Sequence, residues 1–291
     1  MQSTGMPKAE TFPSASRAAW MLVGFLSSLT LLVYAPVLSK LFHVWHSDED
    51  MAHAMFVPIV VGYVIWQRRE ELGQLQPQLS RSGAMLCLLA AMVRVLSTLT
   101  GEVLLGRIAL LCTLGAIVHL FFGMGVIRKL AFPIFLLLFS IPIPKVIYTY
   151  FTLSLQLIAS ALSELMLDSL GYTVLRNGNL LELAGQKLSV AEACSGIRSL
   201  FSLLFLVVTY LYFHEDRSWR RWLVLAATVP TAILVNALRI VVTGAVGEYD
   251  PVFALGLFHA SAGWVLSLAG FVTLMVIHLL LHKVNPRRRV Q

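Results

Sequence analysis

Three residues that could cooperate in cleaving a peptide bond stand at the ends of successive apolar segments: Cys194, Arg239 and His259. A thiolate can attack a carbonyl, a guanidinium can stabilise the resulting oxyanion, and an imidazole can move the proton. Because successive membrane spans alternate in direction, all three positions are expected at the same depth. The spacing predicts a candidate active site at one face of a membrane.

The residues around the cysteine favour a reactive thiol. Ser195 and Gly196 suit the first positions of a helix, and a helix N-terminus carries partial positive charge. Arg198 would add positive charge close by, and both effects lower a thiol pKa. The alternative is that Cys194 packs as a small apolar side chain.

Two further groups of polar residues are candidates for lining the same site. Arg239 within a span would cost about 2.5–3.5 kcal/mol at the membrane centre, and Asn236 lies three residues earlier on the same helix face. This pair indicates a polar pocket, although an interfacial anchor is the alternative. Asp50 and His53 form a second outer cluster, expected as a rim that contacts substrate or as a solvated loop. We expect no metal and no cofactor.

The segments that must position these residues are apolar blocks of roughly 15–25 residues, the length that crosses a bilayer. Hydrophobic residues make up 58% of the 291 residues and charged ones 13%, against about 25% in soluble proteins. The predicted fold class is an all-α polytopic membrane protein with about eight transmembrane helices. The spans are 19–38, 55–66, 84–98, 104–122, 130–140, 197–213, 222–242 and 260–281.

Two segments depart from this pattern. Residues 145–170 are apolar but interrupted by polar side chains, which predicts an amphipathic helix at the interface. Residues 171–189 carry Asn177-Gly178-Asn179 between two short apolar runs, 174–176 and 180–183, which predicts a small extracytoplasmic β-hairpin.

The distribution of basic residues predicts the orientation. With both ends of the chain inside, most of the 22 Lys and Arg residues fall in cytoplasmic segments, as the positive-inside rule requires. Only Lys40, Lys145, Arg176 and Lys187 fall in segments outside. The net charge of +7 therefore reflects topology, and no basic stripe with aromatic residues indicates nucleic-acid binding.

These motifs resemble the exosortase/archaeosortase family. The likeness rests on Ala193-Cys194-Ser195-Gly196-Ile197-Arg198, on Asn236-Ala237-Leu238-Arg239 and on His259. It extends to residues 50–69, to Ile141-Pro142-Ile143-Pro144 and to 171–179, so it covers about 45–264. The organisation is then a cytoplasmic tail at 1–18, one exosortase-like membrane domain at 19–282 and a basic cytoplasmic tail at 283–291.

The resemblance implies a cysteine transpeptidase or protease of the bacterial cytoplasmic (inner) membrane, with its active site facing the periplasm. Its partners would be membrane lipid, an unknown acceptor nucleophile and exported proteins that end in a sorting tail. That tail has a Pro-Glu-Pro motif, a helix and a basic cluster. The implied catalytic residues are Cys194, Arg239 and His259, with Arg198 and Asn236 as further motif positions. Such enzymes occur in bacteria that make extracellular polysaccharide.

Other function classes account for fewer of these features. A transporter or flippase for a polysaccharide precursor would explain many spans and intramembrane arginines. Such proteins commonly show inverted repeats and broken helices at mid-membrane, whereas here the polar cluster lies at the outer edge and no repeat is visible. A membrane acyltransferase would use a His/Asp pair, which only Asp50 and His53 offer.

Overall fold

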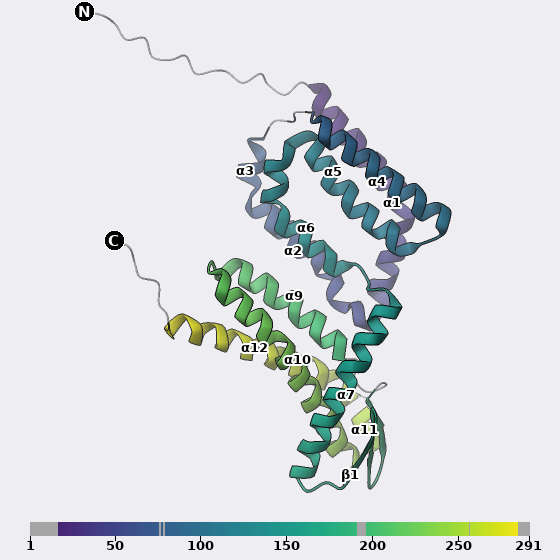
Figure 1. Ribbon diagram of the computed structural model, residues 1–291, viewed down its shortest axis with the longest axis vertical. Helices are drawn as coiled ribbons and strands as arrows, with labels where there is room; N and C mark the ends of the chain where they lie inside the picture. Colours follow the sequence, from purple (N-terminus) through teal and green to yellow (C-terminus); the bar gives the residue numbers. More distant parts are fainter. Residues whose placement is uncertain (1–16, 76, 78, 191–195, 256, 285–291) are drawn as a thin grey trace, which may run out of the picture. The chain divides into compact units, whose positions relative to one another are not determined.

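The computed structural model describes residues 17–75, 77, 79–190, 196–255 and 257–284 (Figure 1). In this part of the chain, eight helices are long and apolar enough to cross a membrane. The remaining regular structure is mainly short helices and one three-stranded sheet. The predicted fold class, an all-α polytopic membrane protein with a small β element, is confirmed.

The chain forms two compact units, and each is described by itself. The first comprises residues up to Val44 and Phe56–Ile141. Its elements are α1 (Arg17–Ser47, to Val44), α2 (Val57–Gln67), α3 (Arg69–Gly73), α4 (Arg81–Thr100), α5 (Val103–Lys129), α6 (Ala131–Leu137) and the 3-10 helix η2 (Leu138–Ser140).

A tight helical hairpin, α4–α5, dominates the first unit. Ser80 caps α4 by accepting a hydrogen bond from the Gly83 N–H, and Gly101 ends the helix in the left-handed conformation with φ 72°. The two helices approach so closely that a Cβ at Gly83 would lie 2.4 Å from the Leu120 Cα. Small residues are what allow such contact between membrane helices.

The charged ends of α2 and α5 meet within this unit. Arg68 donates to the Lys129 carbonyl at 2.6 Å, and Lys129 pairs with Glu71. The sequence places Arg68 and Lys129 on the same, cytoplasmic side, so their contact is consistent with the predicted orientation.

Intramembrane Arg94 has local partners in the first unit. Its guanidinium donates to the Val33 carbonyl and to Thr98, both at 3.2 Å, and lies 5.3 Å from the Tyr34 ring centroid. The attraction between a cation and an aromatic face offsets part of the free energy that the cation loses with its hydration.

The second unit comprises Trp45–Met55 and Pro142–Gln291 and holds all the candidate site residues. Its helices are η1 (Glu49–Met55), α7 (Lys145–Ser169), α9 (Gly196–His214), α10 (Ser218–Gly247), α11 (Pro251–Leu255) and α12 (Leu257–Val284). Long helices α9, α10 and α12 pack against one another, and α7 packs against α9 and α10.

The sheet contains the predicted hairpin and one more strand. Strand β1 (Val174–Asn177) pairs with β2 (Leu180–Leu183), in register at Asn177 and Leu180. The turn is centred on Gly178 and Asn179, and only the glycine has a positive φ, 66°, which fits a type II′ turn. Strand β3 (Lys187–Ser189), which the sequence did not predict, pairs antiparallel with β2.

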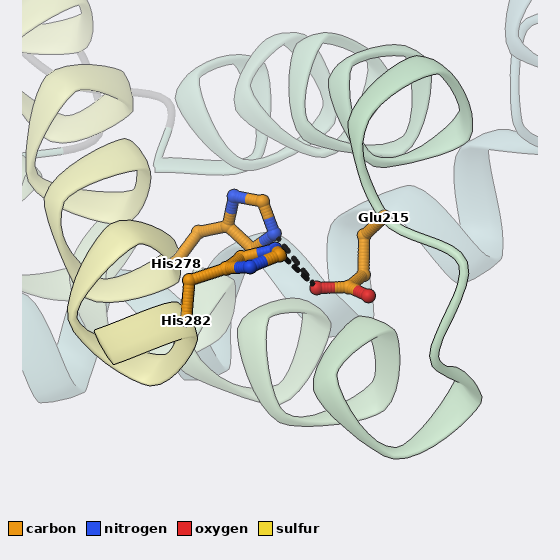
Figure 2. A group of neighbouring side chains, drawn as sticks. All are labelled: Glu215, His278 and His282. Atoms are coloured by element: carbon orange, nitrogen blue, oxygen red, sulfur yellow. Dashed lines mark hydrogen bonds and ion pairs between the residues drawn. The ribbon is translucent and has the colours of Figure 1, made fainter. Parts of the chain in front are cut away.

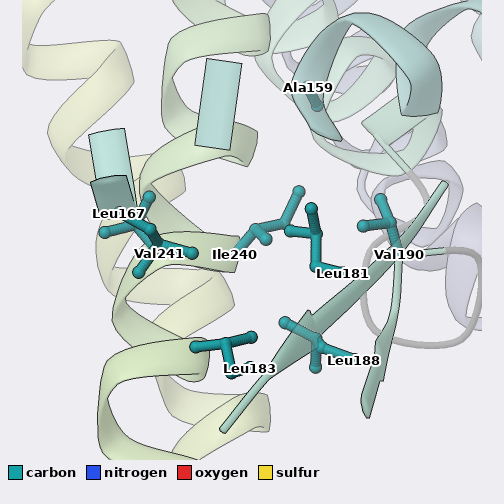
Figure 3. Close-up of a cluster of buried hydrophobic side chains, with 8 residues drawn as sticks. All are labelled: Ala159, Leu167, Leu181, Leu183, Leu188, Val190, Ile240 and Val241. Atoms are coloured by element: carbon teal, nitrogen blue, oxygen red, sulfur yellow. The ribbon is translucent and has the colours of Figure 1, made fainter. Parts of the chain in front are cut away.

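The sheet covers a buried apolar cluster (Figure 3). Leu181, Leu183 and Leu188 from the sheet meet Ile240 and Val241 of α10. The Gln186 side chain fixes this docking because it donates to the Gly244 carbonyl at 2.7 Å. The sheet therefore contributes to the core of the second unit, and Gln186 holds it in position on α10.

The eight apolar helices are not the same eight segments that the sequence predicts. Lys145–Ser169 is long and apolar enough to cross a membrane, whereas Ala131–Ser140 is one of the shorter apolar helices. Helix α5 also extends to Lys129, past a non-helical residue, Gly123, that the apolar pattern did not reveal.

The contacts of α7 do not test the predicted interfacial position, but they place the helix against α9 and α10. Tyr148, near its start, bonds to the same carboxylate as Arg198 in the first turn of α9. Ser163, about 22 Å further along α7, donates to the Ala237 carbonyl of α10. Both contacts are at the same end of the antiparallel α9–α10 pair, and from Ser163 to Leu167 the helix follows the last turns of α10, from Ala237 to Gly244.

We expect Gly83→Ala to destabilise the first unit by about 1–3 kcal/mol, because the new methyl group would overlap the α5 backbone. Thermal unfolding of the purified protein in detergent measures the change. Gly115→Ala on α5 is the matched control, since a Cβ there would meet nothing within 4 Å. Equal melting temperatures for the two variants would contradict the close α4–α5 contact.

Candidate active site

Every predicted site residue that the structure describes lies in the second unit. Gly196 is the first residue of α9, and His259 lies in the first turn of α12, where only its backbone is described. Cys194 and Ser195 lie outside the described residues. The geometry of the site therefore rests on α9, α10, α12 and η1.

Arg239 is buried within the bundle and directed at α12. Its side chain is 7% exposed, and a Cβ at Gly263 would lie 3.1 Å from its Cζ and Nη2. Position 259 precedes Gly263 by four residues, so it lies about one turn away on the same face of α12. The fold thus brings the guanidinium beside the helix face that carries His259.

Asn236 has an unusual environment one turn before Arg239. Its side chain is 2% exposed, and neither Nδ2 nor Oδ1 has a hydrogen-bond partner among the described residues. Buried amides in proteins nearly always have partners, so such a group needs an explanation. An amide with a free donor and a free acceptor is suited to binding an extended peptide.

Asp50 links two helices at this end of the bundle. Its Oδ1 accepts a hydrogen bond from the Arg198 Nε at 2.8 Å, and its Oδ2 accepts one from the Tyr148 hydroxyl of α7. The exposed fractions of the Asp50 and Arg198 side chains are 24% and 35%, so the ion pair is partly shielded. Asp50 therefore fixes η1 between α7 and the first turn of α9.

This arrangement revises what the sequence indicates about the arginines. The Arg198 charge is balanced by Asp50, whereas Arg239 lies deeper in the bundle. Tyr148 was missed by sequence reasoning, because a tyrosine in an apolar helix carries no signal for a partner 98 residues earlier. The polar residues scattered along 145–170 were the available hint that this helix has a buried polar face.

His53 also anchors η1 on α9. It is 8% exposed, and its ring lies 6.2 Å from that of Phe205, centroid to centroid. A buried imidazole packed on an aromatic ring is better placed to hold η1 than to meet solvent. Asp50 and His53 thus contribute to the structure of the site, in place of the solvated loop considered from the sequence.

A second polar cluster lies at the other end of α9, α10 and α12, and could hold a metal ion. Figure 2 shows Glu215 facing His278 and His282 of α12. Their Nε2 atoms lie 3.0 and 2.9 Å from Glu215 Oε2. Nothing in the sequence around these two histidines indicated a carboxylate partner.

The residues around this cluster favour a hydrogen-bond network over a metal site. Arg220, fully buried, lies 3.1 Å from His282 Nδ1 and 3.4 Å from Glu215 Oε2. A guanidinium can only donate, so His282 Nδ1 accepts and its Nε2 carries the proton that faces Glu215. A divalent cation would need that Nε2 lone pair and would add charge beside Arg220.

The cluster holds Glu215 in its charged form. Burial raises the pKa of the carboxyl, but hydrogen bonds from the Arg217 backbone N–H, His278 and Arg220, with the nearby His282, outweigh it. The net effect lowers the pKa from 4.5 to about 2. Glu215 therefore retains its negative charge throughout the physiological pH range.

We predict that the Asp50, Tyr148 and Arg198 side chains are energetically coupled. Asp50→Asn, Tyr148→Phe and their double variant form a double-mutant cycle, measured by unfolding in detergent. The expected coupling is about 0.5–3 kcal/mol, as for groups in one hydrogen-bond network. Tyr150→Phe serves as the control, because Tyr150 is 72% exposed; additive effects of Asp50→Asn and Tyr148→Phe would refute the link.

We also predict a pH dependence of stability that originates in Glu215. Its pKa is lower in the folded than in the unfolded protein, so its contribution is complete above about pH 4.5. The contribution is then lost as the pH falls towards 2. The free energy of unfolding of the wild type should drop over this interval more than that of Glu215→Gln, and parallel pH profiles would argue against the network.

Comparison with known proteins assigns the family. The transmembrane exosortase family matches residues 45–276, which include every candidate site residue. Neither the search of curated proteins nor the search of solved structures gives a match. With a match over most of its length and a multi-pass helical fold, the chain belongs to the transmembrane exosortase family.

Proposed function

We propose that this membrane exosortase is a cysteine protease or transpeptidase. Its substrates would be exported proteins with a C-terminal sorting tail, consisting of a Pro-Glu-Pro motif, a transmembrane helix and a basic cluster. The enzyme would act in the bacterial inner membrane with its site facing the periplasm. The charge distribution supports the location, and the family supports the substrate class.

The observation that supports this reaction best is the burial of Arg239 beside the face of α12 that carries His259. A guanidinium in a low-dielectric pocket stabilises a developing negative charge far more than it would in water. Gly263 permits the approach, because any larger residue there would push the guanidinium away.

The proposed mechanism uses one thiol and two basic groups. The Cys194 thiolate attacks the carbonyl beside the Pro-Glu-Pro motif, and Arg239 stabilises the tetrahedral oxyanion. His259 gives a proton to the leaving amine, which departs with the transmembrane tail, and a thioester to Cys194 remains. Water or an acceptor nucleophile at the cell surface then attacks the thioester and releases the thiolate.

The neighbouring residues have supporting roles in this proposal. Asn236, with its buried unpartnered amide, binds the peptide backbone of the substrate. Asp50 and Tyr148 hold Arg198 in a fixed position. They thereby fix the beginning of α9, whose first residue, Gly196, is two positions after Cys194. Pre-organisation of this kind lowers the cost of reaching the transition state.

The test is co-expression with one sorting-tail substrate, followed on a gel and by mass spectrometry of its new C-terminus. Cys194→Ala should abolish cleavage, and Arg239→Ala should lower turnover about a hundredfold or more, because one oxyanion donor is lost. Cys112→Ala, at a lipid-exposed cysteine, should cleave normally.

The same experiment distinguishes the alternatives. Normal cleavage by Cys194→Ala, with the protein present in the membrane, would rule out the cysteine mechanism. If glycan export is lost in that variant while processing continues, the chain is a transporter or flippase. A new C-terminus carrying an added group indicates transfer, and a free carboxylate indicates hydrolysis.

A further inference from the structure

The buried polar network and the proposed site lie at opposite ends of the same three helices. Glu215 directly follows α9, whose first residue is two positions after Cys194. Arg220 lies in the first turn of the helix that carries Arg239. His278 and His282 lie in the last two turns of the helix that carries His259. Each helix of the site is therefore tied at its far end to one carboxylate.

The three helices are matched in length between these ends. Nineteen residues separate Gly196 from Glu215, Arg220 from Arg239, and Gly263 from His282. Contacts occur at both ends of the antiparallel pair α10 and α12, between Arg220 and His282 and between Arg239 and Gly263. In helical geometry each interval spans about 28 Å, close to the thickness of a bilayer core.

Contacts midway along the helices keep the same register. A Cβ at Gly270 of α12 would lie 2.8 Å from Val235 Cγ2 of α10 and 3.8 Å from Leu203 Cδ2 of α9. The buried side chains of the surrounding cluster are hydrophobic, and Thr231, which also contacts this position, uses its hydroxyl within α10 by donating to the Ala227 carbonyl. Hydrophobic side chains bury nearly as much apolar surface when one helix shifts by a turn, so these contacts alone specify the register weakly.

The network cannot slide in this way. The Glu215 carboxylate accepts hydrogen bonds from the Arg217 N–H at 2.8 Å and from both imidazoles, and Arg220 adjoins it at 3.4 Å. Glu215 and Arg220 are 1% and 0% exposed. A shift of one turn would leave a buried charge without a partner, which is far more costly than an apolar mismatch.

We propose that Glu215, Arg220 and His278 are positioning residues that set the axial register of α9, α10 and α12. By fixing one end of each helix, they keep the beginning of α9, Arg239 and the His259 face of α12 at a common depth. The register itself stands independently, whereas its consequence for catalysis rests on the proposed function.

The register is tested by cross-linking, without any assay of cleavage. In the full chain with Cys87→Ala, Cys112→Ala and Cys194→Ala, the pair Val235→Cys/Gly270→Cys should form a disulfide rapidly on mild oxidation. A second pair, Val235→Cys/Leu274→Cys, reports a shift of one turn. Mass spectrometry of the linked peptides gives both rates.

Removal of the Glu215 charge should slow the first cross-link about tenfold and raise the second, since partly mispaired helices sample other registers. The variant is Glu215→Gln, and the matched control is Leu211→Ala, which removes a buried side chain one turn earlier on α9. If Glu215→Gln does not accumulate, Glu215→Gln/Arg220→Met takes its place, because no buried charge is left unpaired. Equal rates in variant and control would overturn the proposal.

The catalytic consequence is measured separately, in protein that retains Cys194. Glu215→Gln should lower kcat by about a hundredfold, the effect of misplacing catalytic groups by about 1 Å, with KM nearly unchanged. Leu211→Ala should leave kcat near the wild-type value at temperatures where both variants are folded. A register shift with normal kcat would refute the catalytic role alone, and absence of cleavage by the wild type would refute the proposed function alone.

Discussion

Polar groups buried in an apolar helix bundle need partners, and this constraint shapes the second unit at both of its ends. Glu215 meets its constraint with partners on two helices, α10 and α12, and with a hydrogen bond from its own backbone turn. Asp50 meets it by accepting from Tyr148 and Arg198. Because lipid offers no substitute for these bonds, each carboxylate holds together helices that apolar packing alone would leave free to slide. Asn236 does not meet it within the described part of the chain, since neither polar atom of its buried amide has a partner there.

This unpartnered amide belongs to the proposed site. A group that is costly to bury without a partner is retained where binding supplies the partner. Asn236 and Arg239 share one face of α10, and the guanidinium packs against a glycine of α12. The proposed site is thus a group of polar side chains that the bundle holds in place. The hydrogen bonds at Asp50 secure the nearby end of α9, and the sheet secures the end of α10 by docking Gln186 on Gly244.

The family match and the contacts between the helices are independent observations that support the same site. The match to transmembrane exosortases covers residues 45–276, and it says that the chain is a membrane exosortase. The contacts explain how such a chain can present chemistry at one depth. On each of α9, α10 and α12, nineteen residues separate the level of Glu215 from the level of Arg239, so residues far apart in sequence reach the same depth. In the first unit, the α4–α5 hairpin depends on close packing at Gly83.

The sequence by itself determined the membrane class, the positions of most helices, the hairpin at Gly178 and the candidate residues, because hydrophobic length and turn chemistry are local. It did not determine the third strand, the kink at Gly123 or the interaction of Tyr148 with Asp50. Those depend on contacts between distant segments, or on backbone conformation that an apolar pattern does not encode. Nothing in the sequence marked the histidines near the end of α12 as partners of a buried carboxylate. Only the tertiary structure placed them around Glu215, because burial of a charge is a property of the packed bundle and of no single helix.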